Sequence, residues 1–210
     1  AAFVWGAAFH WYSGDHFEAI EAVHQRWPDK GLVLSECCVG RQPPVDPWAV
    51  AERYGHDILG NLNHFAHAWC DWNILLDEQG GPNHVQNFCD APMIGHAAEG
   101  RLKIAPSYYY IGHFSRFLAP GSRRIAVTGY TDALECTAAR TPSGAIAAVI
   151  LNRGDAPVSF RLRHRERLCP LESPAHSILT AVWSGPRLAY GGGRVRAPDD
   201  LSVAMPLGFA

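Results

Sequence analysis

The sequence predicts an α/β half followed by an all-β half, namely the C-terminal part of a (β/α)8 barrel and then a small β-sandwich. Strand-like and helix-like segments alternate over residues 1–118, as expected of βα units. Short strands separated by turn residues follow over residues 119–183, with strands expected at 134–140, 145–151, 158–162 and 176–182. This pattern is typical of a sandwich. Residues 184–210, with three consecutive glycines and scattered prolines, are expected to form an irregular tail.

Three apolar runs place the strands of the barrel half. The runs at 7–12, 32–35 and 68–73 each close on polar or aromatic residues, and the strand ends at Tyr12, Glu36 and Trp72 lie 24 and 36 residues apart. A barrel of about 250 residues averages roughly 31 residues per βα unit. Three units cannot close a barrel, so either further strands precede this segment or the sheet is open and doubly wound.

Helices are expected between these strands. Asp15 is expected to cap the first helix, whose apolar stripe ends at Trp27. Asp46 caps a second helix with Pro47 at its first position. A long Gly/Pro-rich loop that includes residues 80–83 is expected after the third strand. A third helix is then expected over residues 108–118, before a Pro-Gly pair.

Composition excludes several classes of function. The net charge is -2 and the pI is near 6.6, which gives no electrostatic case for nucleic acid. No apolar run approaches the roughly 20 residues of a membrane span. The six cysteines form no CxxC pattern and are expected to be free thiols. His64 and His67 are three apart without a third ligand at metal-like spacing, so neither a metal nor a cofactor is expected.

Glu36 is the strongest candidate for chemistry. It directly follows the buried run at 32–35, and barrel enzymes place catalytic groups at the carboxyl ends of their strands. His10 and Tyr12 end one neighbouring strand, and Trp72 and Asn73 end the other, so all would surround one opening. The alternative is a loop glutamate in a salt bridge.

Asp71 is a second candidate carboxylate. Side chains alternate between the two faces of a strand, so Asp71 and Trp72 cannot both point into the barrel. If Trp72 offers its flat face to a sugar, Asp71 faces the helices and is structural.

Eight segments in order resemble the glucosylceramidase family, glycoside hydrolase family 30. They are FHWY (9–12), SECCVG (35–40), DWN (71–73), GGPN (80–83), NFCDAP (87–92), YIGHFSRF (110–117), VILNR (149–153) and PAHSI (174–178). The resemblance implies a retaining β-glycosidase that acts on a β-glucoside or a glucosylated lipid. It also implies that Glu36 is the nucleophile and that the glucose pocket is lined by His10, Tyr12, Cys38, Trp72 and Asn87.

The same resemblance implies that the acid/base glutamate belongs to an earlier barrel strand, outside residues 1–210. The chain is therefore expected to need the missing N-terminal half of the barrel and to have no meaningful glycosidase activity alone. The family also includes β-1,6-glucanases and xylanases, which leaves the exact glycoside open, as it leaves the compartment.

Two alternatives lie outside glycosidase catalysis. A carbohydrate-binding module built on the β-rich half would expose its aromatics there, but most flank strand ends in the first half, among them Trp11 and Trp69. A degenerate pseudoenzyme is disfavoured because Glu36 and its surroundings are present.

Overall fold

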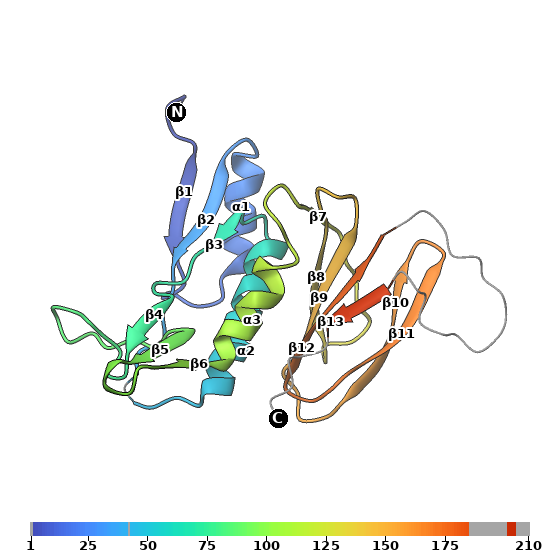
Figure 1. Cartoon of the computed structure of the whole chain (residues 1–210). Helices are drawn as coiled ribbons and strands as arrows, with labels where there is room; N and C mark the ends of the chain where they lie inside the picture. The colour runs from blue at the N-terminus through green and yellow to red at the C-terminus, as the bar shows by residue number, and fades with distance from the viewer. Residues whose placement is uncertain (1, 42, 185–200, 205–210) are drawn as a thin grey trace. The chain divides into compact units, whose positions relative to one another are not determined.

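A computed structural model describes residues 2–41, 43–184 and 201–204, without the side chains of Arg167 and 201–204. The chain divides into two compact units, residues 1–110 and 111–210 (Figure 1). None of the helices in the described part is long and apolar enough to cross a membrane.

Unit 1 contains a parallel sheet of three strands in the order β1-β2-β3. The strands are β1 (Gly6–His10), β2 (Gly31–Glu36) and β3 (Ala68–Trp69), and the helices between them are α1 (Phe17–Arg26) and α2 (Pro47–Asn63). Leu32 and Leu34 of β2 are buried, as the apolar run predicts. Trp72 lies beyond β3 because that strand is only two residues long.

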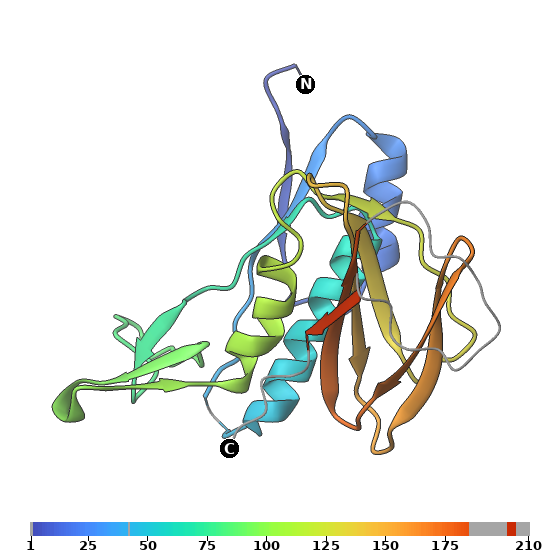
Figure 2. The ribbon, with the colours of Figure 1, turned by 45° about the vertical axis from the view of Figure 1, so that its right-hand side comes forward.

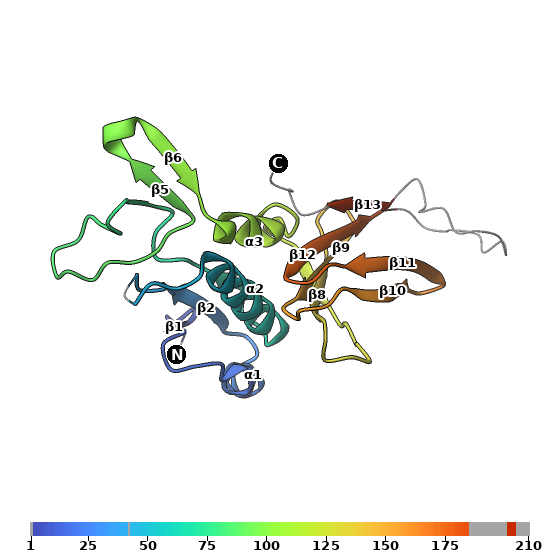
Figure 3. The ribbon, with the colours of Figure 1, turned by 90° about the horizontal axis from the view of Figure 1, so that it is seen from below.

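Both helices cover the same face of this sheet (Figure 3). Phe9 and Leu32 of the strands share a cavity with Ile20 of α1 and Asn61 of α2. Consecutive strand order with helices on one face is the arrangement of a barrel wall. A doubly wound sheet would place helices on both faces.

The two helix starts differ in how their backbone N–H groups are satisfied. The Asp46 carboxylate accepts the Trp48 N–H at 3.2 Å and Pro47 begins α2, as predicted. The prediction that Asp15 caps α1 is wrong, since His16 precedes the helix and no side chain caps it. The Asp15 carboxylate lies 3.3 Å from the His56 ring instead, so a contact with α2 replaces the cap.

A second small sheet in unit 1 occupies a segment that the sequence predicts to be mainly a long Gly/Pro-rich loop. It contains β4 (Leu75–Asp77), β5 (Met93–His96) and β6 (Arg101–Ile104), with a short 3-10 helix, η1 (Ala97–Glu99), between β5 and β6. β4 pairs with β5 in parallel and β5 with β6 in antiparallel fashion. The helix α3 (Pro106–Ser115) follows and crosses the boundary between the units.

In the described residues of unit 2, every element apart from the end of α3 is a β-strand (Figure 2). Its larger sheet has the order β13-β12-β9-β8-β7, and a two-stranded β10-β11 sheet accompanies it. The strands are β7 (Arg123–Ile125), β8 (Glu135–Arg140), β9 (Ile146–Asn152), β10 (Val158–His164), β11 (Arg167–Ser173), β12 (Ser177–Trp183) and β13 (Leu201–Ala204).

The core of unit 2 lies between these two sheets. Ile146, Ile150 and Leu179 are buried in it, and Phe160 and Leu162 of β10 pack against them. β8, β9, β10 and β12 match strands predicted from the sequence, whereas β7 and β11 were not predicted.

The segment predicted as an irregular tail contains one described element. β13 pairs antiparallel with β12, which differs from the irregular structure expected there. Residues 185–200 and 205–210, the rest of that segment, lie outside the described residues.

Candidate active site

Glu36 is the last residue of β2, beside the end of β1. The register of these parallel strands shifts after Phe9, which places His10 opposite Glu36. His10 Nδ1 lies 3.7 Å from Glu36 Oε1. The Glu36 side chain is one-quarter exposed, so the carboxylate is held by the framework and still reaches solvent.

Tyr12 is the direct hydrogen-bond donor to this carboxylate. Its hydroxyl donates to Glu36 Oε1 at 3.1 Å and lies 3.5 Å from Cys38 Sγ. The ring is about half exposed, but partial burial of the phenol, followed by the contacts with Cys38 and Glu36, raises the pKa of Tyr12 well above its ordinary value. The phenol therefore remains protonated at neutral pH and can donate to an ionised carboxylate.

Trp72 and Asp71, which follow the end of β3, point in different directions, as predicted. The Trp72 side chain is 55% exposed, while its backbone N–H donates to the Cys37 carbonyl and to Asp71 Oδ1, each at 2.9 Å. Tyr54 of α2 donates its hydroxyl to the same Asp71 oxygen at 3.2 Å. Asp71 therefore faces the helix layer and has a structural role.

The environment of Asp71 is apolar enough to affect its ionisation. Burial is the largest influence and raises the pKa of Asp71 to about 6, although the hydrogen bonds from Trp72 and Tyr54 favour the ionised form. A carboxyl engaged in this way with the helix layer does not face the opening beside Glu36.

The loop that carries Asn87 is joined to the segment after Glu36. Gly40 and Cys89 form an antiparallel bridge, the Arg41 N–H donates to the Phe88 carbonyl at 3.0 Å, and the Asp90 N–H donates to the Val39 carbonyl at 2.7 Å. Asn87 itself is exposed. Asn87 and Trp72 lie on segments that adjoin Glu36, and among the described residues no hydrogen bond joins their side chains to it.

Gly80 is required where this loop turns. Its φ is +89°, and an added Cβ would lie 2.5 Å from both Arg41 Cδ and the Cys89 carbonyl oxygen. Glycine alone tolerates both the positive φ and this close approach. The Gly80-Gly81 pair thus shapes the loop next to the site.

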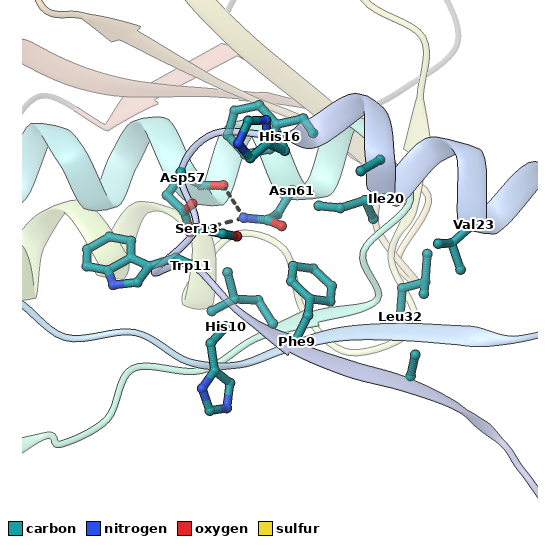
Figure 4. A pocket seen from close by; sticks show the side chains of 15 residues that line it. Phe9, His10, Trp11, Ser13, His16, Ile20, Val23, Leu32, Asp57 and Asn61 are labelled. Carbon is teal, nitrogen blue, oxygen red and sulfur yellow. Dashed lines mark hydrogen bonds between the residues drawn. The ribbon is translucent and has the colours of Figure 1, made fainter.

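A cavity of about 250 Å³ lies on the other face of the sheet. Figure 4 shows Phe9, Ile20 and Asn61 around it, with the His10 ring directed away. Asp57 at its wall accepts hydrogen bonds from Trp69 Nε1 at 2.6 Å and from Asn61 Nδ2 at 3.0 Å. Burial raises the pKa of Asp57 to about 6. This cavity belongs to the packing of helices on strands and not to the cluster around Glu36.

The two histidines considered as a metal pair both contact backbone groups. His64 Nδ1 lies 2.7 Å from the Gly60 carbonyl oxygen, and His67 Nδ1 accepts the Leu32 N–H at 3.2 Å. In the part of the chain that the structure describes, no three His, Cys, Asp or Glu side chains are grouped to hold a metal ion.

Sequence reasoning missed Cys89 as a neighbour of the site. Its Sγ lies 3.2 Å from Cys38 Sγ although the two residues are 51 apart. Cys89 follows Asn87 within NFCDAP, but nothing local in the sequence shows that this segment pairs with the one after Glu36. The antiparallel bridge at Gly40 brings them together.

Comparison with family models identifies both halves of the chain. Residues 1–118 match the "Glycosyl hydrolase family 30 TIM-barrel domain" and residues 121–181 match the "Glycosyl hydrolase family 30 beta sandwich domain". The predicted fold class, part of a (β/α)8 barrel followed by a β-sandwich, is therefore confirmed, and so is the resemblance found in the sequence.

Two curated relatives carry glucosylceramidase names. Lysosomal acid glucosylceramidase of Mus musculus is 35% identical over 195 residues, which cover 87% of this chain and 38% of the relative. Putative glucosylceramidase 3 of Caenorhabditis elegans is 33% identical over 188 residues, covering 85% of this chain and 36% of the relative. The chain thus spans little more than a third of the length of these relatives.

Two solved structures are also similar to this chain. SrfJ from Salmonella typhimurium superposes with a TM-score of 0.82 at 35% identity, over 85% of this chain and 40% of that one. The endo-β1,6-glucanase BT3312 superposes with a TM-score of 0.78 at 26% identity, over 88% of this chain and 42% of that one.

Proposed function

Because this chain belongs to glycoside hydrolase family 30, we propose that it supplies the nucleophile side of a retaining β-glycosidase, with Glu36 as the attacking carboxylate. The proposal rests on the position of Glu36 at the end of β2, opposite His10 at the end of the parallel strand β1. There its carboxylate accepts a hydrogen bond from Tyr12. This is where barrel enzymes hold their reacting groups.

In the proposed reaction, Glu36 bonds to the anomeric carbon and forms a glycosyl-enzyme as the aglycone leaves. Retaining glycosidases need a second carboxyl about 5–5.5 Å from the first, which protonates the leaving oxygen and then activates water. Asp71 does not fit this role because its carboxylate is engaged with Tyr54 on the helix side. The acid/base is therefore proposed to lie on an earlier barrel strand.

His10, Tyr12 and Cys38 are proposed to surround the sugar at the reacting centre, and Trp72 and Asn87 to contact it from the adjoining loops. A half-exposed indole offers a flat apolar face to the C–H bonds of a pyranose, while amide and phenol groups can hydrogen-bond to its hydroxyls.

The proposed substrate is a β-glucoside, with a glucosylated lipid as one form of it. The 35% identity to a lysosomal acid glucosylceramidase supports this choice. A β-1,6-glucan is the second candidate, supported by the 26% identity to an endo-β1,6-glucanase. Comparing kcat/KM of the complete protein for glucosylceramide and for a β-1,6-linked glucan would distinguish the two.

The decisive experiment is covalent trapping. The complete protein that carries this chain is treated with a 2-deoxy-2-fluoro-β-glucoside, digested, and analysed by mass spectrometry. The label is expected on Glu36 and should be absent from Glu36→Gln, whereas the matched control Asp71→Asn should keep it. Label on any other residue would falsify the nucleophile assignment.

A second measurement concerns the chain by itself. We expect the purified 210-residue chain to hydrolyse no aryl β-glucoside at a meaningful rate, since a lone nucleophile lacks the proton donor for the leaving group. Turnover that Glu36→Gln abolishes would show instead that a partner carboxyl lies within these residues.

A further inference from the structure

Beside the proposed nucleophile lies a pair of thiols that glycoside hydrolysis does not explain. Cys38 Sγ and Cys89 Sγ are 3.2 Å apart and both cysteines are free. A disulfide bond is about 2.05 Å long, so a relative movement of roughly 1 Å would bring the sulfur atoms to bonding distance.

The backbone holds this pair in place. Gly40 lies opposite Cys89 in the antiparallel bridge, and Cys38, two residues before Gly40, lies on the same face by strand alternation. Cys38 and Cys89 are therefore diagonal neighbours across the bridge. The N–H of Cys89 also donates to the Gly80 carbonyl at 3.0 Å, which fixes the loop on that side.

The two thiols differ in their access to solvent. Cys89 is only 2% exposed, whereas Cys38 is half-buried and faces Tyr12, whose ring is 55% exposed. A small oxidant in the opening therefore reaches Cys38 first, while Cys89 lies directly behind it.

We propose that Cys38 and Cys89 form an oxidisable dithiol, in which a hydroperoxide oxidises Cys38 and Cys89 closes a disulfide. In the first step the Cys38 thiolate takes the terminal oxygen of the peroxide, giving a sulfenic acid and releasing the alcohol or water. The Cys89 sulfur then displaces the hydroxyl from Cys38 sulfur as water. Two thiols and one hydroperoxide thus yield one disulfide, one alcohol or water and one further water.

Cys89 is not suited to the first step, and its low thiolate content makes the second step slow at neutral pH. Burial, followed by the contact with Cys38, raises the pKa of Cys89 to about 12. Its thiolate is scarce at neutral pH, so the closing step is expected to accelerate as the pH rises towards 9.

The disulfide would change the surroundings of Glu36. Cys38 Sγ now lies 3.5 Å from the Tyr12 hydroxyl, which also donates to Glu36. Drawing Cys38 towards Cys89 would weaken that contact and tie the segment after Glu36 covalently to the loop of Asn87. Any loss of hydrolysis on oxidation depends on the proposed function, whereas formation of the disulfide does not.

The test uses hydrogen peroxide on the folded protein at mildly alkaline pH, followed by blocking of the remaining thiols. Cleavage after Lys30 and Arg41 by trypsin and before Asp77 and Asp90 by Asp-N releases peptides 31–41 and 77–89. We expect these two peptides joined by a disulfide and about 2 Da lighter than the sum of their thiol forms. Dithiothreitol should separate them.

Adjacent cysteines provide the matched control. Cys37→Ala should keep the joined peptides, because Cys37 Sγ instead donates to the Cys70 carbonyl at 3.5 Å. Cys38→Ala and Cys89→Val should each abolish them. The joined peptides should also disappear when wild-type protein is oxidised in guanidinium, which removes the geometry without a substitution.

Several outcomes would overturn the proposal. These are the absence of joined peptides from oxidised wild-type protein, a link that fragment ions assign to Cys37, dimers on a non-reducing gel in place of the internal link, and Cys38 accumulating as sulfinic acid. If the disulfide forms and hydrolysis by the complete protein is unaffected, the dithiol stands and its coupling to the active site is wrong.

Discussion

The central strands of the two units differ in where they place polar side chains. In unit 2, every residue of β9 is buried, and β12 is buried at all positions but one. In unit 1, β2 is buried at three of its first four positions but ends in the partly exposed Glu36. Apolar strands stabilise the fold through packing, whereas polar side chains at strand ends lie where a ligand can reach them. If Glu36 is the nucleophile, as proposed, stability and chemistry are separated along this chain.

The strongest way to test this separation is to remove the nucleophile. In the complete protein, Glu36→Gln should lower kcat by on the order of 10³-fold or more, because the covalent step loses its attacking group. The thermal midpoint should change little, since Glu36 is partly exposed. Steady-state kinetics with an aryl β-glucoside and a melting curve measure the two effects. Near-normal kcat would refute the catalytic role of unit 1 as assigned.

The reverse effect is expected in the sandwich. Ile150 is 2% exposed in the core of unit 2, and Ile150→Ala should lower the free energy of unfolding by roughly 2–5 kcal/mol through lost burial and a residual cavity. Denaturant unfolding measures this, with the exposed Ser159→Ala as control. The KM of the folded complete protein for an aryl β-glucoside should be unchanged. A raised KM would mean that the two units are functionally coupled.

The pH dependence of stability tests a buried carboxyl group of unit 1. The pKa of Asp57 is raised to about 6 in the folded state, from an ordinary value of 3.8. The folded state therefore holds this proton more tightly, so its stabilising effect is complete below about pH 4 and is lost as the pH rises through about 6.

Asp57→Asn should keep the hydrogen bonds from Trp69 and Asn61 while removing this titration. At pH 7 we expect the variant to exceed wild type in the free energy of unfolding by on the order of 1–3 kcal/mol, and at pH 4 the two should converge. Urea unfolding at both pH values is the measurement. Equal stability differences at both pH values would contradict the assignment of the proton to Asp57.

The smallest expected effect refines the site itself. Tyr12→Phe removes the hydroxyl that donates to Glu36 and should lower kcat/KM of the complete protein about tenfold, since a hydrogen bond to a charged group contributes roughly 1.5 kcal/mol or more. Tyr130→Phe is the matched control, because Tyr130 is fully exposed in unit 2. An unchanged kcat/KM for Tyr12→Phe would mean that this hydrogen bond is incidental.

Local patterns in the sequence predicted the elements that carry the site. The apolar run before Glu36 predicts β2, and Asp46 with Pro47 predicts the start of α2, because burial and capping act over a few residues. Asp71 faces the helices, as its hydrogen bond from Tyr54 shows, but it lies beyond the end of β3, so the predicted strand alternation is not the reason.

The errors arise where distant segments meet. The parallel pairing of β4 with β5 joins residues separated by a loop of glycines and prolines, so no local periodicity indicates it. The same applies to the contact of Cys38 with Cys89. Asp15 fits the pattern of a helix cap, but a histidine 41 residues away lies beside its carboxylate.

The antiparallel bridge at Gly40 has a consequence for how a ligand could enter. The N–H groups of Arg41 and Asp90 donate to backbone carbonyls across this loop pair, and that of Cys89 donates to the Gly80 carbonyl within its own loop. All three should therefore exchange slowly with deuterium although they lie outside the named strands. Slow exchange would show that this pair of loops is already ordered before a ligand binds. Little of the binding free energy of a ligand would then be spent on ordering the loop.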